Sequence, residues 1–192
     1  MTTGNTENLT IGFSLPWLTA TLDAMEQVTA LIPEDRLEWR LNDPSGKWHF
    51  SLAEIAMHSA DARRMFARML SGSESTDGYW SAGPGEDGIW PFQPYGTKQA
   101  VLGSLKEART ELQPYLDLPL NSLMETTEGT RRRFEQNLAR MREKQIDTAN
   151  DEKRGAATIL RILMACAVHE SGHRSSLQTL LRMHGIHVKQ GE

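Results

Sequence analysis

The chain has 192 residues, of which 39% are hydrophobic and 24% charged, and its net charge is −4. These values predict one globular domain, residues 1–192, and exclude a disordered chain. Basic and acidic residues are interleaved, which excludes the basic tracts that bind nucleic acid or an anionic membrane surface.

The cysteine content and the apolar segments indicate a cytoplasmic protein. Cys166 is the only cysteine, so an intrachain disulfide is excluded and a reducing compartment is expected. Residues 1–6 have neither the basic nor the apolar region of a secretory signal. The most apolar stretch, residues 159–168, contains Arg161 and is far shorter than the ~20 residues that cross a bilayer.

The first predicted helix begins near Pro16 and ends before Pro33. Its apolar residues recur at intervals of three and four positions, which is the spacing of one buried stripe on a helix. A turn-forming cluster follows at residues 42–46. The stripe consists of Leu18, Leu22, Met25 and Val28.

The second predicted helix begins after Ser51 and runs to about Leu70. Ser51 and Glu54 have the spacing of a capping box, in which both side chains bond to free amides of the first turn. The sequence Ser-Gly-Ser at residues 71–73 ends this helix. Its expected buried face consists of Ile55, Ala62, Phe66 and Met69.

Residues 71–96 combine aromatic side chains with glycine and proline, which excludes a long helix. Two interpretations are open for this segment: a lid or pocket wall over the end of a bundle, or a packed connection between helices. Its aromatic residues are Tyr79, Trp80, Trp90, Phe92 and Tyr95.

A third helix is predicted from Thr97 to about Leu112, where Pro114 bends or breaks the chain. Residues 120–146 are predicted to be helical but more polar. The three arginines at 131–133 are expected on a solvated face of this helix. The residues expected to be buried in it are Leu123, Phe134, Leu138 and Met141.

The last predicted helix is the longest, covering residues 155–184, with a loop before it at 147–151 and Gly185 at its end. We find no internal repeat and no convincing run of strands. The sequence therefore predicts an all-α fold, a four-helix bundle with an extra helix or a long Gly/Pro/Trp-rich connection.

The last helix contains the sequence HESGH at residues 169–173. His169 and His173 stand at positions i and i+4, so they project from one face of a helix and can bind the same ion. That face also carries apolar residues, which predicts that both imidazoles point into the bundle. His58 lies on the buried stripe of the second helix. If the two helices are neighbours, it supplies a third ligand and leaves the open position typical of a catalytic zinc-type site.

These two helices resemble the signature helices of the DinB superfamily. The resemblance rests on WHFSLAEIAMH at residues 48–58 and HESGHRSSLQTLLRMHG at residues 169–185. It implies a four-helix bundle that holds a divalent metal ion on His58, His169 and His173. Zinc and nickel are the expected metals, with iron as a further candidate, since all of them accept imidazole ligands.

The superfamily includes bacillithiol S-transferases and a mycothiol-dependent maleylpyruvate isomerase. The resemblance therefore implies a small-molecule substrate and a metal that activates a water or a low-molecular-weight thiol. Glu170 has two candidate roles: a catalytic proton acceptor, or a carboxylate that orients an imidazole.

Two other functions compete with this one. A zincin metalloprotease uses the same H-E-x-x-H pattern, but Ser176 and Thr179 stand where the extended metzincin pattern has Gly and His. The second alternative is a metal-binding or structural bundle that acts by association, as a homodimer, without catalysis. Cys166, one turn before His169, is expected to be a core residue.

Overall fold

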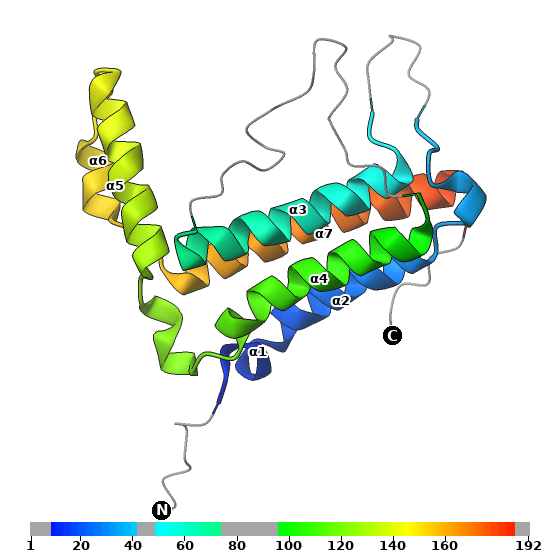
Figure 1. Ribbon diagram of the computed structural model, residues 1–192, viewed down its shortest axis with the longest axis horizontal. Coiled ribbons are helices and arrows are strands. Elements are labelled where there is room, and N and C mark those ends of the chain that lie inside the picture. Colours follow the sequence, from blue (N-terminus) through cyan, green and yellow to red (C-terminus); the bar gives the residue numbers. More distant parts are fainter. Residues whose placement is uncertain (1–8, 42–48, 74–95, 187–192) are drawn as a thin grey trace, which may run out of the picture.

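The structure, a computed structural model, describes residues 9–41, 49–73 and 96–186. Four long helices lie side by side in this part of the chain (Figure 1). In the described residues all regular elements are helices, and no strand is assigned. The one β-bridge there, between Thr10 and Pro119, is isolated. The predicted all-α bundle is therefore confirmed. The four long helices are α2 (Pro16–Ala30), α3 (Leu52–Ser71), α4 (Lys98–Leu116) and α7 (Ile159–Met183).

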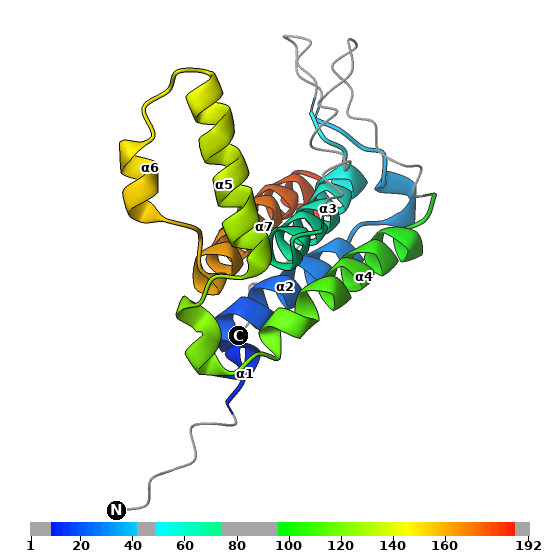
Figure 2. The same cartoon turned by 60° about the vertical axis from the view of Figure 1, so that its left-hand side comes forward.

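A helical arm leaves one end of these four helices. Figure 2 shows its two helices standing apart from the bundle, near the last turn of α3 and the first turn of α7. No helix in the described part of the chain is long and apolar enough to cross a membrane. The arm consists of α5 (Glu128–Glu143) and α6 (Ala149–Arg154), and the short elements are α1 (Ile11–Ser14), η2 (Glu34–Arg36) and η3 (Leu120–Met124).

Both helices predicted in the first third of the chain are confirmed. Pro16 opens α2, and its predicted stripe is buried. The Ser51 hydroxyl accepts a bond from the Glu54 amide, while the Glu54 carboxylate accepts one from the Ser51 amide. This capping box begins α3, and Gly72 ends it in the left-handed conformation, with φ of 75°.

Two predicted boundaries in the third helix and its successor are wrong. α4 continues through Pro114 to Leu116, because the proline lies only two residues from the end and Leu116 is fully buried there. Residues 120–146 do not form one helix. A short 3₁₀ turn, η3, comes first, and α5 begins separately after Thr127, whose side chain caps it.

The predicted loop at residues 147–151 contains the start of α6. The Asp147 carboxylate accepts a bond from the Ala149 amide, and the Thr148 hydroxyl donates to Glu152, so local side chains support this short helix. α7 begins at Ile159, four residues later than predicted, because Gly155 has a φ of 67° that a helix does not allow. Its predicted end at Gly185 is confirmed.

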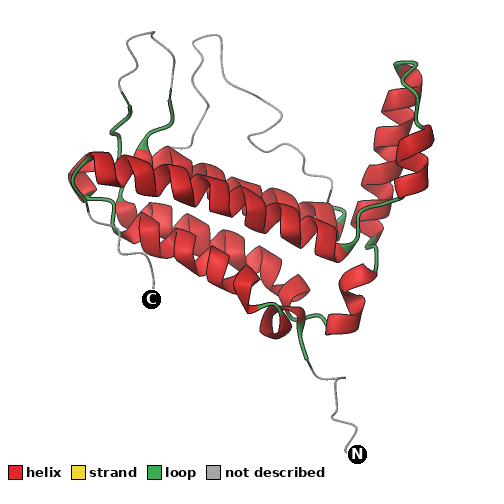
Figure 3. Cartoon of the chain, turned by 180° about the vertical axis from the view of Figure 1, so that it is seen from behind, coloured by secondary structure: helices red, strands yellow, loops and turns green. Residues whose placement is uncertain are grey.

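The bundle interior has two apolar clusters with a polar layer between them. One cluster lies toward the end of the bundle that carries η2, and the other lies toward the arm. Figure 3 shows the long helices from behind, lying along one another. The polar layer consists of the buried side chains Ser59, Arg63 and Glu170.

The arm meets the bundle through a contact between two glycines, which allows a direct test. A Cβ added at Gly129 would lie 2.7 Å from the carbonyl oxygen of Leu70 and closer still to the Gly72 backbone. We expect Gly129→Ala to lower the free energy of unfolding by about 1–3 kcal/mol, because backbone must move to admit the methyl group. Urea denaturation monitored by circular dichroism measures the change.

Gly103→Ala is the matched control for this substitution. Gly103 lies inside α4, and an added Cβ there meets no atom within 4 Å. We expect this variant to be more stable than the wild type by about 0.5–1 kcal/mol, since alanine is the better helix former. Equal stability of the two variants would show that α5 does not pack on α3 as described.

Candidate metal centre

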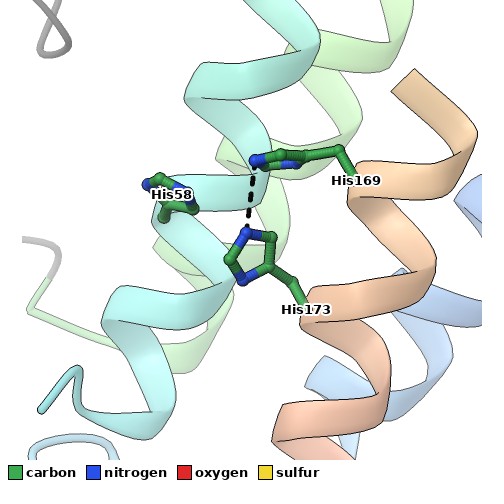
Figure 4. Close-up of side chains that lie close together, drawn as sticks. All are labelled: His58, His169 and His173. Carbon is green, nitrogen blue, oxygen red and sulfur yellow. Dashed lines mark hydrogen bonds between the residues drawn. The ribbon is translucent and has the colours of Figure 1, made fainter. Parts of the chain in front are cut away.

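Three histidines from two neighbouring helices converge inside the bundle. Figure 4 shows His169 and His173 reaching from α7 toward His58 on α3. One ring nitrogen of each residue takes part, and these three atoms all lie within 4.8 Å of one another. The Nε2 atoms of His169 and His173 are 3.2 Å apart and share a hydrogen bond. The three residues predicted from sequence are therefore brought together.

Local structure explains how these side chains meet. His169 and His173 stand one turn apart on α7, so their rings overlap the same stretch of the neighbouring helix, with centroids 4.4 Å apart. The His58 ring centroid lies 4.5 Å from that of His173 and 5.2 Å from that of His169. Phe50 and Phe66 flank the group at centroid distances of 5.3 Å from His58 and 6.1 Å from His169.

Burial keeps the three imidazoles neutral. Burial and the neighbouring histidines lower the pKa of His58 to about 3, and burial with His169 lowers the pKa of His173 to about 4. Burial also lowers the pKa of His169, against the opposing effect of the Glu170 carboxylate. A neutral imidazole has a lone pair, which is the form that coordinates a metal.

The donor set fits a divalent transition metal. Three imidazole nitrogens at this spacing suit zinc, nickel, iron or copper, and do not suit magnesium or calcium, which prefer oxygen ligands. Among the described residues, no cysteine or carboxylate joins the three histidines in this group. Cys166 is buried in the core as expected, and burial raises the pKa of its thiol to about 12.

Glu170 lies inside the bundle with both carboxylate oxygens engaged. The Ser59 hydroxyl donates to Oε1 at 2.5 Å, and the Arg63 guanidinium donates to Oε2 at 2.9 Å. The side chains of Glu170 and Arg63 have no exposed surface. The prediction placed Glu170 beside the histidines on α7, and the structure adds that its carboxylate belongs to a buried ion pair.

Arg63 is the residue that the sequence analysis missed. It also donates to Glu26 at 2.9 Å and to the backbone carbonyl oxygens of Leu22 and Leu105, so it links α3 to α2, α4 and α7. The buried face that the sequence predicted for this helix did not include it, so its burial is a finding of the structure. Arg63 continues the buried stripe of Ala56 and Ala60, and an arginine at a core position needs partners of opposite charge.

The other histidines of the described residues do not belong to this group. His184 packs against Trp39 with ring centroids 3.8 Å apart, away from the centre. The backbone carbonyl of His49 accepts a bond from Arg40. His187 and most of the aromatic segment, residues 74–95, lie outside the described residues, so both interpretations of that segment stay predictions.

A family model described as the DinB superfamily matches residues 18–177 of this chain. The match begins in α2 and ends in α7, so it includes α3 and α4, most of α2 and α7, and all three histidines. No curated protein and no solved structure matches the chain.

The buried ion pair predicts a large loss of stability when one partner is removed. We expect Glu170→Ala to lower the free energy of unfolding by about 3–5 kcal/mol, because Arg63 would lose its fully buried counterion and keep only the partly exposed Glu26. Asp23→Ala is the control, since Asp23 pairs with Arg109 at the surface and should contribute about 1 kcal/mol or less. Chemical denaturation of both variants gives the comparison. Similar losses in the two would contradict the importance of the buried pair.

The lowered pKa values predict that the centre resists protonation. In metal-free protein, His58 and His173 should stay neutral at pH 5, where a histidine in the unfolded chain, with a pKa of 6.5, is protonated. The unfolded state then binds more protons than the folded state, so the free energy of unfolding should fall as the pH drops below about 6.5. Histidine ring chemical shifts followed by NMR provide the measurement. Titration midpoints near 6.5 in the folded protein would refute it.

Proposed function

The chain belongs to the DinB superfamily, and we propose that it is a metal-dependent enzyme acting on a small-molecule substrate. In this proposal His58, His169 and His173 hold one divalent ion, with zinc or nickel as the expected metal and iron as a further candidate. The reaction is the transfer of a low-molecular-weight thiol or the attack of an activated water.

The convergence of three neutral imidazoles is the observation that carries the proposal. The three side chains are buried or half-buried, with one on α3 and two on one face of α7. The helices therefore hold the donor atoms close together before any ion binds. Placing three imidazoles at one site in a protein interior costs free energy, because each loses hydrogen bonds to water there. A shared cation compensates for that loss at all three.

When bound by the three histidines, a divalent ion would lower the pKa of a water or thiol that it also holds. The chain's own residues provide the setting. Phe50 and Phe66 give the centre apolar neighbours, which reduces competition from bulk water. Each neutral imidazole keeps one ring nitrogen with a lone pair at physiological pH. The proton in the hydrogen bond between His169 and His173 would have to leave its Nε2 atom for both residues to bind an ion through that atom.

For Glu170 we propose a positioning role. Its two oxygens already bond to Ser59 and Arg63, and the residue is fully buried. Through these bonds it fixes the turn of α7 that carries His169 against α3. The alternative, in which Glu170 accepts a proton during catalysis, requires its carboxylate to give up at least one of these bonds. The same consideration disfavours the peptidase function, in which the corresponding glutamate is the general base.

The test of the proposal is metal content. We expect about one zinc or nickel ion per chain in wild-type protein, and loss of the ion in His58→Ala and in His173→Ala, measured by inductively coupled plasma mass spectrometry. His184→Ala is the control, because His184 lies outside the centre and its loss should leave the metal in place. Circular dichroism checks that each variant is folded.

Activity separates the enzyme from the non-catalytic alternative. Zinc- or nickel-loaded wild type should accelerate transfer of a small thiol to an electrophile such as chlorodinitrobenzene, and His58→Ala should not. A wild type that stays metal-free after incubation with both ions would contradict the proposal. Bound metal without any acceleration of thiol transfer or hydrolysis would favour a metal-binding bundle that acts by association, as in the homodimer alternative.

A further inference from the structure

A cavity of about 370 Å³ lies where the arm joins the bundle. Its walls come from the end of α3, from α5 and α6, and from the first turns of α7. Its volume falls within the range of cavities that hold small organic ligands. The arm therefore forms one side of a partly open cavity, and the bundle forms the other.

The floor of this cavity is apolar. Both aromatic and aliphatic side chains take part, and they come from three different helices. Contacts of this kind suit the body of an organic ligand, since they gain free energy by removing apolar surface from water. The floor is made by Phe66 and Met69 of α3, Phe134 and Leu138 of α5, and Ile162 of α7.

Three arginines also line the cavity. Arg133 belongs to α5, Arg154 to α6 and Arg161 to α7, and Asp151 is the one acidic residue in the lining. Within the described ranges, none of these three guanidinium groups forms an ion pair or a side-chain hydrogen bond. Arg131 differs, since it points to solvent and pairs with Glu128. The expected solvated face at residues 131–133 thus holds for Arg131, while Arg133 lines the cavity.

The cavity adjoins the histidine centre. Phe66 lines the cavity, and its ring centroid lies 6.1 Å from that of His169. Ala165, another lining residue, stands one turn before His169 on α7. A ligand in the cavity therefore reaches the immediate surroundings of the centre along the same side of α7.

Backbone and side-chain contacts hold the cavity walls together. The Ile159 amide donates to the Glu125 carbonyl oxygen at 2.9 Å, which joins the two ends of the arm. Arg142 of α5 bonds to Glu152 of α6 at 2.9 Å. The close approach of Gly129 to Gly72 fixes α5 on α3. The three arginines are thus carried by elements whose relative positions are fixed.

We propose that this cavity binds a small organic carboxylate with an aromatic or aliphatic body, next to the histidine centre. The apolar floor takes the body, and Arg133, Arg154 and Arg161 take the carboxylate through charge-assisted hydrogen bonds. Binding of the carboxylate goes beyond the proposed function, because it does not require the metal. The further idea that this carboxylate is the substrate rests on the proposed function.

The experiment uses naphthalene-1-acetate as the probe and its neutral amide, naphthalene-1-acetamide, as the matched ligand. Isothermal titration calorimetry is run on the full chain as purified and after removal of metal by a chelator. We expect the acid to bind metal-free protein about tenfold more tightly than the amide, which is the size expected for hydrogen bonds to a charged group. Arg133→Gln and Arg161→Gln should each weaken the acid about tenfold and leave the amide unchanged.

Two further measurements make the test specific. Arg131→Gln removes the same charge from the same helix outside the cavity, so it should leave both affinities unchanged. In NMR spectra of methyl-labelled methionine, the acid should shift the signals of Met69 and Met141, which line the cavity, and not that of exposed Met124.

Four results would overturn the proposal: no binding of the acid, equal binding of acid and amide, the same loss in Arg131→Gln as in Arg133→Gln, or binding that requires metal and is abolished only by His58→Ala. The last result would place the ligand on the histidine centre alone. Failure of the proposed function gives a different result: the wild-type protein takes up no metal but still binds the acid.

Discussion

The buried ion pair between Arg63 and Glu170 is the interaction on which the rest of this structure depends. It joins α3 to α7 in the polar layer between the two apolar clusters. Glu170 follows His169 directly, and Arg63 stands just over one turn after His58. The pair therefore fixes how far α3 and α7 are displaced along each other, and this displacement decides whether the histidines meet. A buried charge is costly without its partner, so the pair tolerates few alternative alignments.

Charged and neutral side chains lie within a few residues of each other in and beside the polar layer. The charges of Arg63 and Glu170 compensate each other. The two side chains also form hydrogen bonds to Glu26, Ser59 and backbone carbonyls. The histidines beside them are kept neutral by burial, even though the Glu170 carboxylate favours a protonated His169. The charge that the bundle needs for alignment is thus kept within one pair, and the imidazoles stay available as ligands.

The arm adds to the bundle something that the four long helices do not provide. α5 is polar over most of its surface, and its buried residues are few, namely Gly129, Thr130 and Leu138. Phe134, Leu138 and Met141, together with Arg133, line the cavity at the junction with α3 and α7. The bundle thus supplies the histidine centre, and the arm supplies one wall of the cavity beside it.

The sequence by itself determined the parts of this protein that depend on neighbours along the chain. The capping box at Ser51, the buried stripe of α2, and the pairing of His169 with His173 follow from spacings of three and four residues. His58 was also identifiable, because it lies on a helical stripe whose burial could be predicted, and the family resemblance pointed to the same residue.

Only the tertiary structure decided the features that depend on residues far apart in the sequence. Arg63 finds Glu170 107 positions away, and no local spacing reveals such a pair. The continuation of α4 past Pro114 reflects the burial of Leu116, which outweighs a local helix-breaking tendency. Arg133 was indistinguishable from Arg131 in the sequence, since a charged run has the same composition whichever way its side chains point. The physical reason is common to these cases: local hydrogen bonds and periodicity set the helices, whereas desolvation and packing between helices decide which side chains meet.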